Sequence, residues 1–260
     1  MNQMVSILSF NFTIEGIPPI LYPTDNMPDS ISMDFSTRLA RQFGTLMLTL
    51  LFVLPSFTHA STPAMDQELI QAAEQGDLPT VQGLLRAGRD IEARDRSGRT
   101  ALLAATQHNH EAVAEALIKA GADVNAQDRQ RDSAYLLAGA RGYLGILRLT
   151  LAHGADLKST NRYGGTALIP ACERGHVETV RTLIAAGVKV DHVNNLGWTG
   201  LLEAIILGTR GDAQTKIVRM LLDAGANPAL ADKDGVTPLQ HARQRGYHDI
   251  AQMLINAGAR

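Results

Sequence analysis

Apolar residues recur along most of the chain at the spacing of one face of an α-helix. Four residues form one such stripe, which can be buried against a neighbouring element: Val113, Ala114, Leu117 and Ile118. The preceding run, 101–105, is small and apolar throughout, so another helix can approach it closely. The pattern predicts a helical hairpin with its turn near Asn109 and His110.

This pattern returns at a nearly constant period of about 33 residues. Six glycines follow the predicted second helices with this period, and only the interval before Gly225 is longer: Gly88, Gly121, Gly154, Gly187, Gly225 and Gly258. A Thr or Ser precedes the predicted first helices with the same period, and only the interval before Thr237 is longer: Thr100, Ser133, Thr166, Thr199 and Thr237. Two series in phase predict a stack of repeated units, each of which buries its apolar stripe against its neighbours.

Each unit also carries the local signals of helix starts and ends. The Thr or Ser hydroxyl can accept a hydrogen bond from a free N–H group at a helix start, as an N-cap residue does. Glycine after the second helix suits the left-handed backbone that often ends a helix. After Gly121, the segment 122–126 leads to an Asp-Arg-Gln-Arg tip. It predicts a short, hairpin-like finger.

These segments resemble the ankyrin repeat. The family's Gly-Ala-Asp-Val-Asn element is intact from Gly121 to Asn125, and looser copies begin at Gly154 and Gly225. Copies of its Thr-Pro-Leu-His element occupy 100–103, 166–169, 199–202 and 237–240. The resemblance implies an all-α fold, an ankyrin-repeat solenoid of about six helix-turn-helix units with short hairpin fingers. It covers about residues 62–260, with an ankyrin-repeat domain of residues 61–260 and repeats at about 62–94, 95–127, 128–160, 161–193, 194–231 and 232–260.

Several positions depart from the family pattern. The histidine of the Thr-Pro-Leu-His element is absent from every copy, so packing of Leu103, Ile169 or Leu202 is expected to replace its hydrogen bond between repeats. Arg131 stands where other repeats have Gly98 and Gly164, which sets its finger apart.

The fifth and first units differ in other ways. The fifth has five extra residues within 208–215, which predict a surface loop bulging from the edge opposite the fingers. The first unit has Gln67 in place of the N-cap and a polar helix over 67–75. A polar outer face would keep this end of the stack in water.

Residues 33–60 have the pattern of a secretory signal peptide. Arg38 and Arg41 precede the apolar run 43–54, and a small-residue site ends at Ala60. We expect cleavage after Ala60 and a periplasmic or secreted protein. An uncleaved membrane anchor is the alternative, although a membrane span needs roughly 20 apolar residues. We expect translation to start at Met33, with residues 1–32 a disordered or doubtful extension.

Composition and motifs weigh against catalysis and nucleic-acid binding. Two of the 24 basic and four of the 26 acidic residues precede Ser61, which leaves 22 of each sign and no net field that favours nucleic acid. The sequence has no phosphate-binding glycine loop, no His-Glu-x-x-His motif and a single cysteine, Cys172, expected to be a buried thiol. We expect no enzyme activity, cofactor, metal or small-molecule substrate.

What remains is a protein-binding surface, which the resemblance places on the finger tips and first helices. Arginine and large aromatic residues dominate interface energies, and both types occur at the predicted tips of the middle repeats. The predicted partner-binding residues are Arg96, Arg99, Arg129, Arg131, Arg162, Tyr163, Leu196, Trp198, Glu203 and Ile206. The partner is expected to present an acidic patch beside an apolar knob.

Three functions are compatible with such a surface. The resemblance to exported bacterial ankyrin proteins favours a periplasmic adaptor that binds and modulates or protects another envelope protein. The first alternative is an inhibitor or stress-protective protein that occludes an enzyme. The second is a membrane-anchored scaffold.

Overall fold

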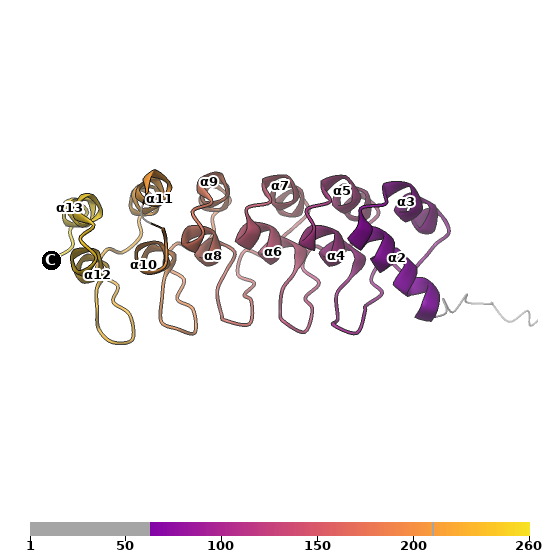
Figure 1. Ribbon diagram of the computed structural model, residues 1–260, viewed down its shortest axis with the longest axis horizontal. Coiled ribbons are helices and arrows are strands. Elements are labelled where there is room, and N and C mark those ends of the chain that lie inside the picture. Colours follow the sequence, from indigo (N-terminus) through magenta and orange to yellow (C-terminus); the bar gives the residue numbers. More distant parts are fainter. Residues whose placement is uncertain (1–62, 210) are drawn as a thin grey trace, which may run out of the picture. The chain divides into compact units, whose positions relative to one another are not determined.

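The computed structural model describes residues 63–209 and 211–260, which form six helix pairs and the loops between them (Figure 1). These residues contain no strand, so the predicted all-α class is confirmed. The predicted signal peptide, 33–60, and the extension, 1–32, lie outside the described residues.

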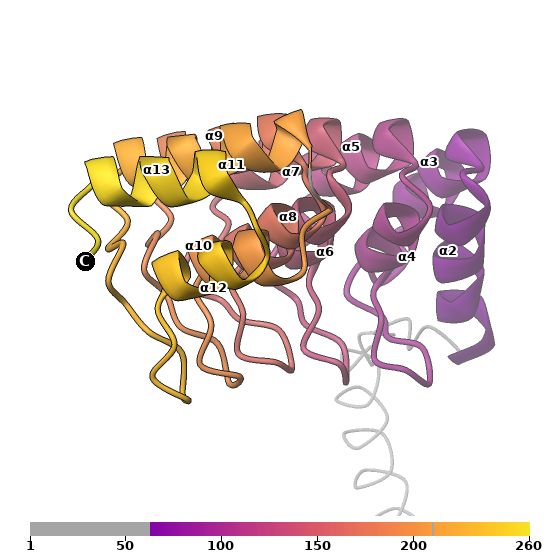
Figure 2. The same ribbon diagram turned by 60° about the vertical axis from the view of Figure 1, so that its left-hand side comes forward.

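The helix pairs are stacked in sequence order. The first helices are α2 (Pro63–Gln75), α4 (Ala101–Gln107), α6 (Ala134–Arg141), α8 (Leu168–Glu173), α10 (Gly200–Ile206) and α12 (Pro238–Gln244). The second helices are α3 (Leu78–Arg86), α5 (Glu111–Lys119), α7 (Leu144–Ala152), α9 (Val177–Ala185), α11 (Asp212–Asp223) and α13 (His248–Asn256). Figures 1 and 2 show two rows, in which the first helices lie between the second helices and the fingers. Contacts run along each row between neighbours, so the predicted stacking is confirmed.

Four of the five predicted N-caps are present. The hydroxyls of Thr100, Ser133, Thr199 and Thr237 each accept a hydrogen bond from the N–H group three residues ahead. Their carbonyl oxygens accept the first intrahelical bond from the fourth residue, as Thr199 O does from Glu203 N at 2.9 Å. These caps satisfy donors that would otherwise stay unpaired at a buried helix start.

The prediction for Thr166 is wrong. Helix α8 begins at Leu168, its N-cap position is Ala167, and the Thr166 hydroxyl is buried without a hydrogen-bond partner among the described residues. The cause is Pro170, the fourth residue after Thr166. Proline has no N–H to donate to the Thr166 carbonyl, and its ring excludes a helical carbonyl at that position. Instead, Ile169 N donates to Thr166 O at 3.3 Å, in a tighter first turn.

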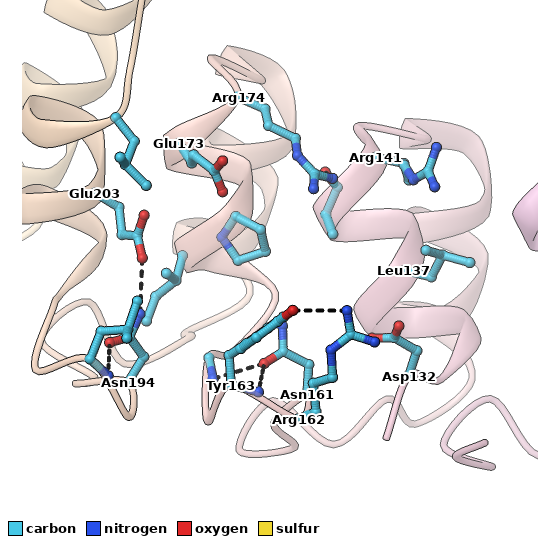
Figure 3. A pocket seen from close by; sticks show the side chains of 16 residues that line it. Asp132, Leu137, Arg141, Asn161, Arg162, Tyr163, Glu173, Arg174, Asn194 and Glu203 are labelled. Carbon is cyan, nitrogen blue, oxygen red and sulfur yellow. Dashed lines mark hydrogen bonds between the residues drawn. The ribbon is translucent and has the colours of Figure 1, made fainter. Parts of the chain in front are cut away.

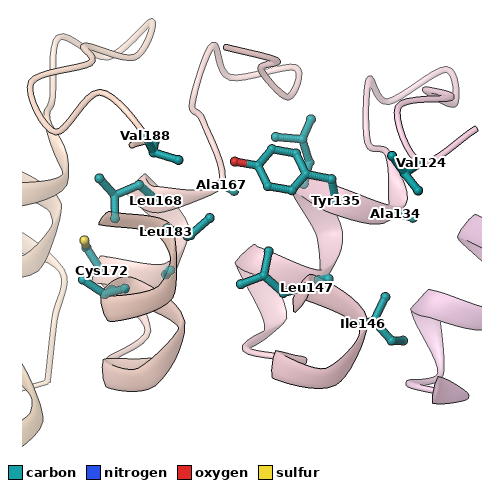
Figure 4. Close-up of a cluster of buried hydrophobic side chains, with 14 of the residues drawn as sticks. Val124, Ala134, Tyr135, Ile146, Leu147, Ala167, Leu168, Cys172, Leu183 and Val188 are labelled. Carbon is teal, nitrogen blue, oxygen red and sulfur yellow. The ribbon is translucent and has the colours of Figure 1, made fainter. Parts of the chain in front are cut away.

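The core runs through the stack between neighbouring repeats (Figure 4). Leu147 and Leu183 from second helices pack with Tyr135 and Leu168 from first helices, and all four side chains are buried. Full burial of one leucine stabilises a fold by roughly 1.5–3 kcal/mol, so the joints between repeats hold the stack together. Leu103, Ile169 and Leu202, which replace the family's histidine, are buried as expected.

Tyr135 is unusual within this core. It stands one repeat away from both Leu102 and Leu168, at the position where those repeats have leucine. Its hydroxyl is buried with no hydrogen-bond partner among the described residues, and burial raises the pKa of the phenol. The larger side chain therefore carries an uncompensated polar atom into the joint.

The predicted bulging loop of the fifth repeat is only partly right, because residues 207–211 separate its helices but most of the insertion is helical. Helix α11 has 12 residues, whereas each of the other five second helices has nine, so three of the five extra residues extend a helix. Gln214 holds the extension in place because its buried side-chain amide donates to the carbonyls of Cys172, at 3.2 Å, and Ala204, at 2.6 Å.

The first helix also differs from its prediction. Helix α2 starts at Pro63, four residues before Gln67, and has 13 residues, against six to eight in the other first helices. Leu69 and Ala73 are buried, while Gln71 and Gln75 are exposed. The polar outer face expected of this unit is present.

The finger that contains Arg131 keeps the shape of the others. Arg131 adopts a φ of 62°, close to the 71° of Gly164 at the equivalent position. A left-handed backbone costs a residue with a side chain roughly 1 kcal/mol, which the surrounding turn must offset. The turn closes with a hydrogen bond from Asp128 N to Asp132 O at 2.9 Å.

Candidate partner-binding groove

A groove of about 370 Å³ lies on the finger side of the middle repeats (Figure 3). We call it the middle groove. Helices α6, α8 and α10 form its floor, and the fingers of the fourth and fifth repeats form one wall. Its lining residues are Asp132, Leu137, Ala140, Arg141, Asn161, Arg162, Tyr163, Gly165, Ile169, Pro170, Glu173, Arg174, Asn194, Leu196, Glu203 and Leu207.

Asparagine side chains shape the two fingers beside the groove. Asn161 Oδ1 accepts hydrogen bonds from the N–H groups of Tyr163, at 2.9 Å, and Gly165, at 3.1 Å. Asn194 Oδ1 does the same for Leu196 and Trp198, at 2.9 and 3.0 Å. Such turns let a short polar side chain replace backbone partners. They place Tyr163 and Leu196 at the tips.

These turns belong to a third periodic series that the sequence interpretation missed. Asp or Asn occurs at the base of every finger with the repeat period, and only the interval before the last member is longer: Asp95, Asp128, Asn161, Asn194 and Asp232. Each Oδ1 accepts from the N–H groups two and four residues ahead. The signal was available in the spacing, because the series is in phase with the Thr and Gly series.

The rim of the middle groove is apolar. Tyr163, Leu196 and Leu207 expose 54%, 53% and 48% of their surface. Exposed large apolar side chains beside charged groups are typical of the anchor positions of protein interfaces.

Arginines gather at one end of the groove. The Arg162 guanidinium lies 4.7 Å from the centre of the Tyr163 ring and donates to its hydroxyl at 2.8 Å. Arg174 donates to the Ala140 carbonyl at 2.7 Å. Burial and the neighbouring Asp128 raise the pKa of Asp132, while Arg162, Arg141 and Arg174 act in the opposite direction. This basic end therefore combines three cations with one half-buried carboxyl group.

Carboxylates gather at the other end. Glu203 is 4% exposed, and its Oε1 accepts a hydrogen bond from Asn194 Nδ2 at 2.9 Å. Oε2 is buried without a partner among the described residues. Burial first, and then the charge of Glu173, raise the pKa of Glu203 to about 7, while the bond from Asn194 acts to lower it. Figure 3 shows Glu203 and Glu173 at the opposite end from Arg141 and Asp132.

A second groove lies between the fingers of the second and third repeats, and one of its arginines, Arg99, is paired within the fold. Its lining residues are Arg96, Ser97, Arg99, Gln107, Asp128, Arg129 and Gln130. Arg99 Nε donates to Asp95 at 2.7 Å, and its Nη1 donates to Glu74 at 3.1 Å and to Gln107. Arg99 thus links α2 of the first repeat to the finger and first helix of the second.

Comparison with known proteins agrees with this architecture. Ankyrin-repeat family models match residues 50–128, 69–161, 135–232 and 210–255. The solved ankyrin repeat domain from Acinetobacter baumannii AYE is 64% identical, with a TM-score of 0.72 over 74% of this chain and 98% of that one. This chain belongs to the ankyrin-repeat family.

Other ankyrin-repeat proteins are similar over different lengths. The ankyrin repeat domain of Bcl-3, a member of the IkappaB family, is 30% identical, with a TM-score of 0.67 over 74% of this chain and 86% of that one. The ankyrin repeat protein YahD of Escherichia coli K12 is 56% identical over 57 residues, which are 22% of this chain and only 28% of YahD. Ankyrin repeats are non-enzymatic modules that mediate protein–protein binding.

The ankyrin stack separates the predicted binding residues into groups. Arg162, Tyr163, Leu196 and Glu203 line the middle groove, and Arg96, Arg99 and Arg129 line the second groove. Arg131, Trp198 and Ile206 are not among the lining residues of either. Trp198 is half-buried, and both its N–H and its carbonyl bond to Asn194.

Several lining residues were missed by the sequence interpretation. Leu207 follows α10, and Asp132 comes directly before the Ser133 cap. Their places depend on how neighbouring repeats are rotated onto one another, and repeat phase alone does not give that rotation.

The remaining chemistry of the described residues is limited. They contain no group of three or more His, Cys, Asp or Glu side chains able to hold a metal ion. Cys172 is buried, and burial raises the pKa of its thiol. Within the same residues, no helix has both the length and the apolar content that crossing a bilayer requires.

Proposed function

We propose that this ankyrin-repeat protein is a non-enzymatic, exported periplasmic adaptor that binds another envelope protein through its middle groove and modulates or protects it. The observation that carries the binding site is the exposure of three large apolar side chains, Tyr163, Leu196 and Leu207, around a floor that combines apolar and charged side chains. The signal-peptide pattern of residues 33–60 supports export.

The fold supports this surface as a rigid platform. The fingers are held by backbone and asparagine hydrogen bonds, including Asn195 N to Tyr163 O at 2.9 Å between neighbouring tips. A preorganised surface loses little conformational entropy when a partner binds. Contacts in the groove can therefore contribute to affinity without a folding step.

Site-specific photo-crosslinking in the native organism tests the binding face. A photoreactive amino acid at Leu196 should capture a discrete partner, because this side chain stands on the rim. The matched control is Arg148, which is exposed on the second helix α7. Equal adducts at both positions, or none at Leu196, would overturn the proposed face.

Export is tested separately. Osmotic-shock fractionation and N-terminal sequencing should place the mature chain in the periplasm, with Ser61 as its first residue. A membrane-bound chain that keeps residues 43–54 would instead support the anchored scaffold. A captured enzyme that loses activity in the complex would support the inhibitor.

A further inference from the structure

Glu203 is a buried acid that the fold leaves half satisfied. Asn194 donates to Oε1, and Oε2 has no hydrogen-bond partner among the described residues. A buried carboxylate normally has a full set of donors or a cation beside it, because burial removes the water that would solvate its charge. Here the unsatisfied atom is buried beneath the floor of a groove that Glu203 helps to line, so a bound molecule reaches it by displacing the side chains that cover it.

The groups around Glu203 do not supply the missing cation. On α8, Glu173 adds a second negative charge, and Cys172 is a buried thiol. On α12, which packs against α10, His241 pairs with Asp232 at 2.7 Å. Arg245, which follows α12, donates to the Ile206 carbonyl at 3.3 Å. Among the described residues, no Lys, Arg or His forms an ion pair with either carboxylate of this acidic end.

Two of the three groove arginines bond elsewhere, and the third, Arg141, lies at the end opposite Glu203 (Figure 3). Arg162 stacks on Tyr163, and Arg174 bonds to the Ala140 carbonyl. Both act on Asp132. The two ends of the groove therefore stay opposite in charge, and the acidic end complements a positively charged side chain.

We propose that the middle groove receives a lysine or arginine side chain of the bound protein between Glu173 and Glu203. This inference rests on the proposed function, since it specifies what the groove binds. Glu173 is half-buried and is reached first, while Glu203 is nearly covered in the unbound molecule. The sequence suggested only an acidic partner, whereas the groove fits a segment with a basic side chain at the α10 end.

A cation suits this end better than a neutral donor. A neutral amide or hydroxyl would satisfy Oε2 but would not offset the charge that Glu203 carries beside Glu173 when it is ionised. A lysine or arginine would satisfy the atom and also offset both charges. Its approach should lower the pKa of Glu203, so binding near neutral pH should release protons from the protein.

Selection from a random-peptide phage library tests the inference on the purified chain. We expect the selected peptides to contain a Lys or Arg whose replacement by norleucine weakens binding about tenfold, the scale of one charge-assisted hydrogen bond. Glu203→Gln should weaken binding by a similar factor, and the two losses should not add. The matched control, Glu178→Gln, changes an exposed carboxylate on α9 and should leave affinity unchanged.

A second measurement does not depend on any variant. Calorimetric titration of the unmodified chain in two buffers of different ionisation enthalpy should show proton release at pH 7. Absence of that release, or peptides that bind Glu203→Gln as tightly as the parent, would overturn the basic-residue inference alone. Peptides that also ignore Leu196→Asp, or a selection that yields no peptide, would overturn groove binding itself.

Discussion

Both grooves on the finger side contain charged side chains, but these side chains differ in whether the fold supplies their hydrogen-bond partners. In the second groove, Arg99 bonds to Asp95, Glu74 and Gln107, so its charge is neutralised within the fold. In the middle groove, Glu203 keeps one oxygen without a partner beside a second carboxylate. The contrast shows that a charged residue near a finger can hold two repeats together or can keep an atom without a partner among the described residues. Residue type does not distinguish the two uses.

The largest expected effect concerns Glu203, whose Oε2 has no hydrogen-bond partner among the described residues. The pKa of Glu203 is raised from an ordinary value of 4.5 to about 7, so the folded state holds a proton that the unfolded state has released between these values. The free energy of unfolding should therefore fall as pH rises through this window, by about 2–3 kcal/mol in all.

Urea unfolding at pH 5 and pH 8 measures this fall, and Glu203→Gln should remove most of it. His176 acts in the opposite direction, because its pKa is lowered by burial and by Arg174. Its contribution is common to both proteins and cancels in the difference. Equal pH slopes in the parent and in Glu203→Gln would show that Glu203 is well solvated.

The next effect concerns Arg99 in the second groove, whose guanidinium is paired within the fold. Arg99→Ala should lower the free energy of unfolding by about 2 kcal/mol, because it leaves half-buried polar partners on two repeats without their donor. The nearby exposed Arg96→Ala should change stability by less than about 0.5 kcal/mol. Urea unfolding of both variants provides the comparison. A loss of partner binding in Arg99→Ala at full stability would mean that Arg99 is a contact residue instead.

The smallest effect separates an unsatisfied group in the core from one in the groove. Tyr135→Phe removes a hydroxyl with no partner among the described residues and should raise the free energy of unfolding by about 1 kcal/mol, with unchanged peptide affinity. Thermal unfolding and the peptide titration measure the two quantities. A destabilised Tyr135→Phe would show that the hydroxyl has a partner in solution.

Much of the fold could be predicted because each repeat carries the same helix-start and helix-end residues at the same spacing. Thr100, Ser133, Thr199 and Thr237 cap their helices as their spacing indicated. The Thr166 prediction failed because Pro170, four residues away, removes the N–H that the cap geometry requires. The insertion in the fifth repeat was misjudged because a buried contact of Gln214 favours a longer helix over a loop.

The candidate site was less predictable, because its properties belong to pairs of repeats. Tyr163, Leu196 and Glu203 were identified from their repeat positions, and all three line the middle groove. The bond from Arg99 to Glu74 could not be predicted in this way, because Glu74 lies 25 residues away on another repeat. Whether an arginine is engaged or available depends on contacts across the joint, which no single repeat encodes.

The opposite ends of the middle groove come from different segments of the chain. Asp132 comes just before α6 and Arg141 is its last residue, whereas Glu203 lies on α10, two repeats later. Because the two ends come from different helix pairs, substitutions in one pair can change the charge at one end of the groove and leave the other end unchanged. The order of charges along the groove therefore follows the order of the repeats in the chain.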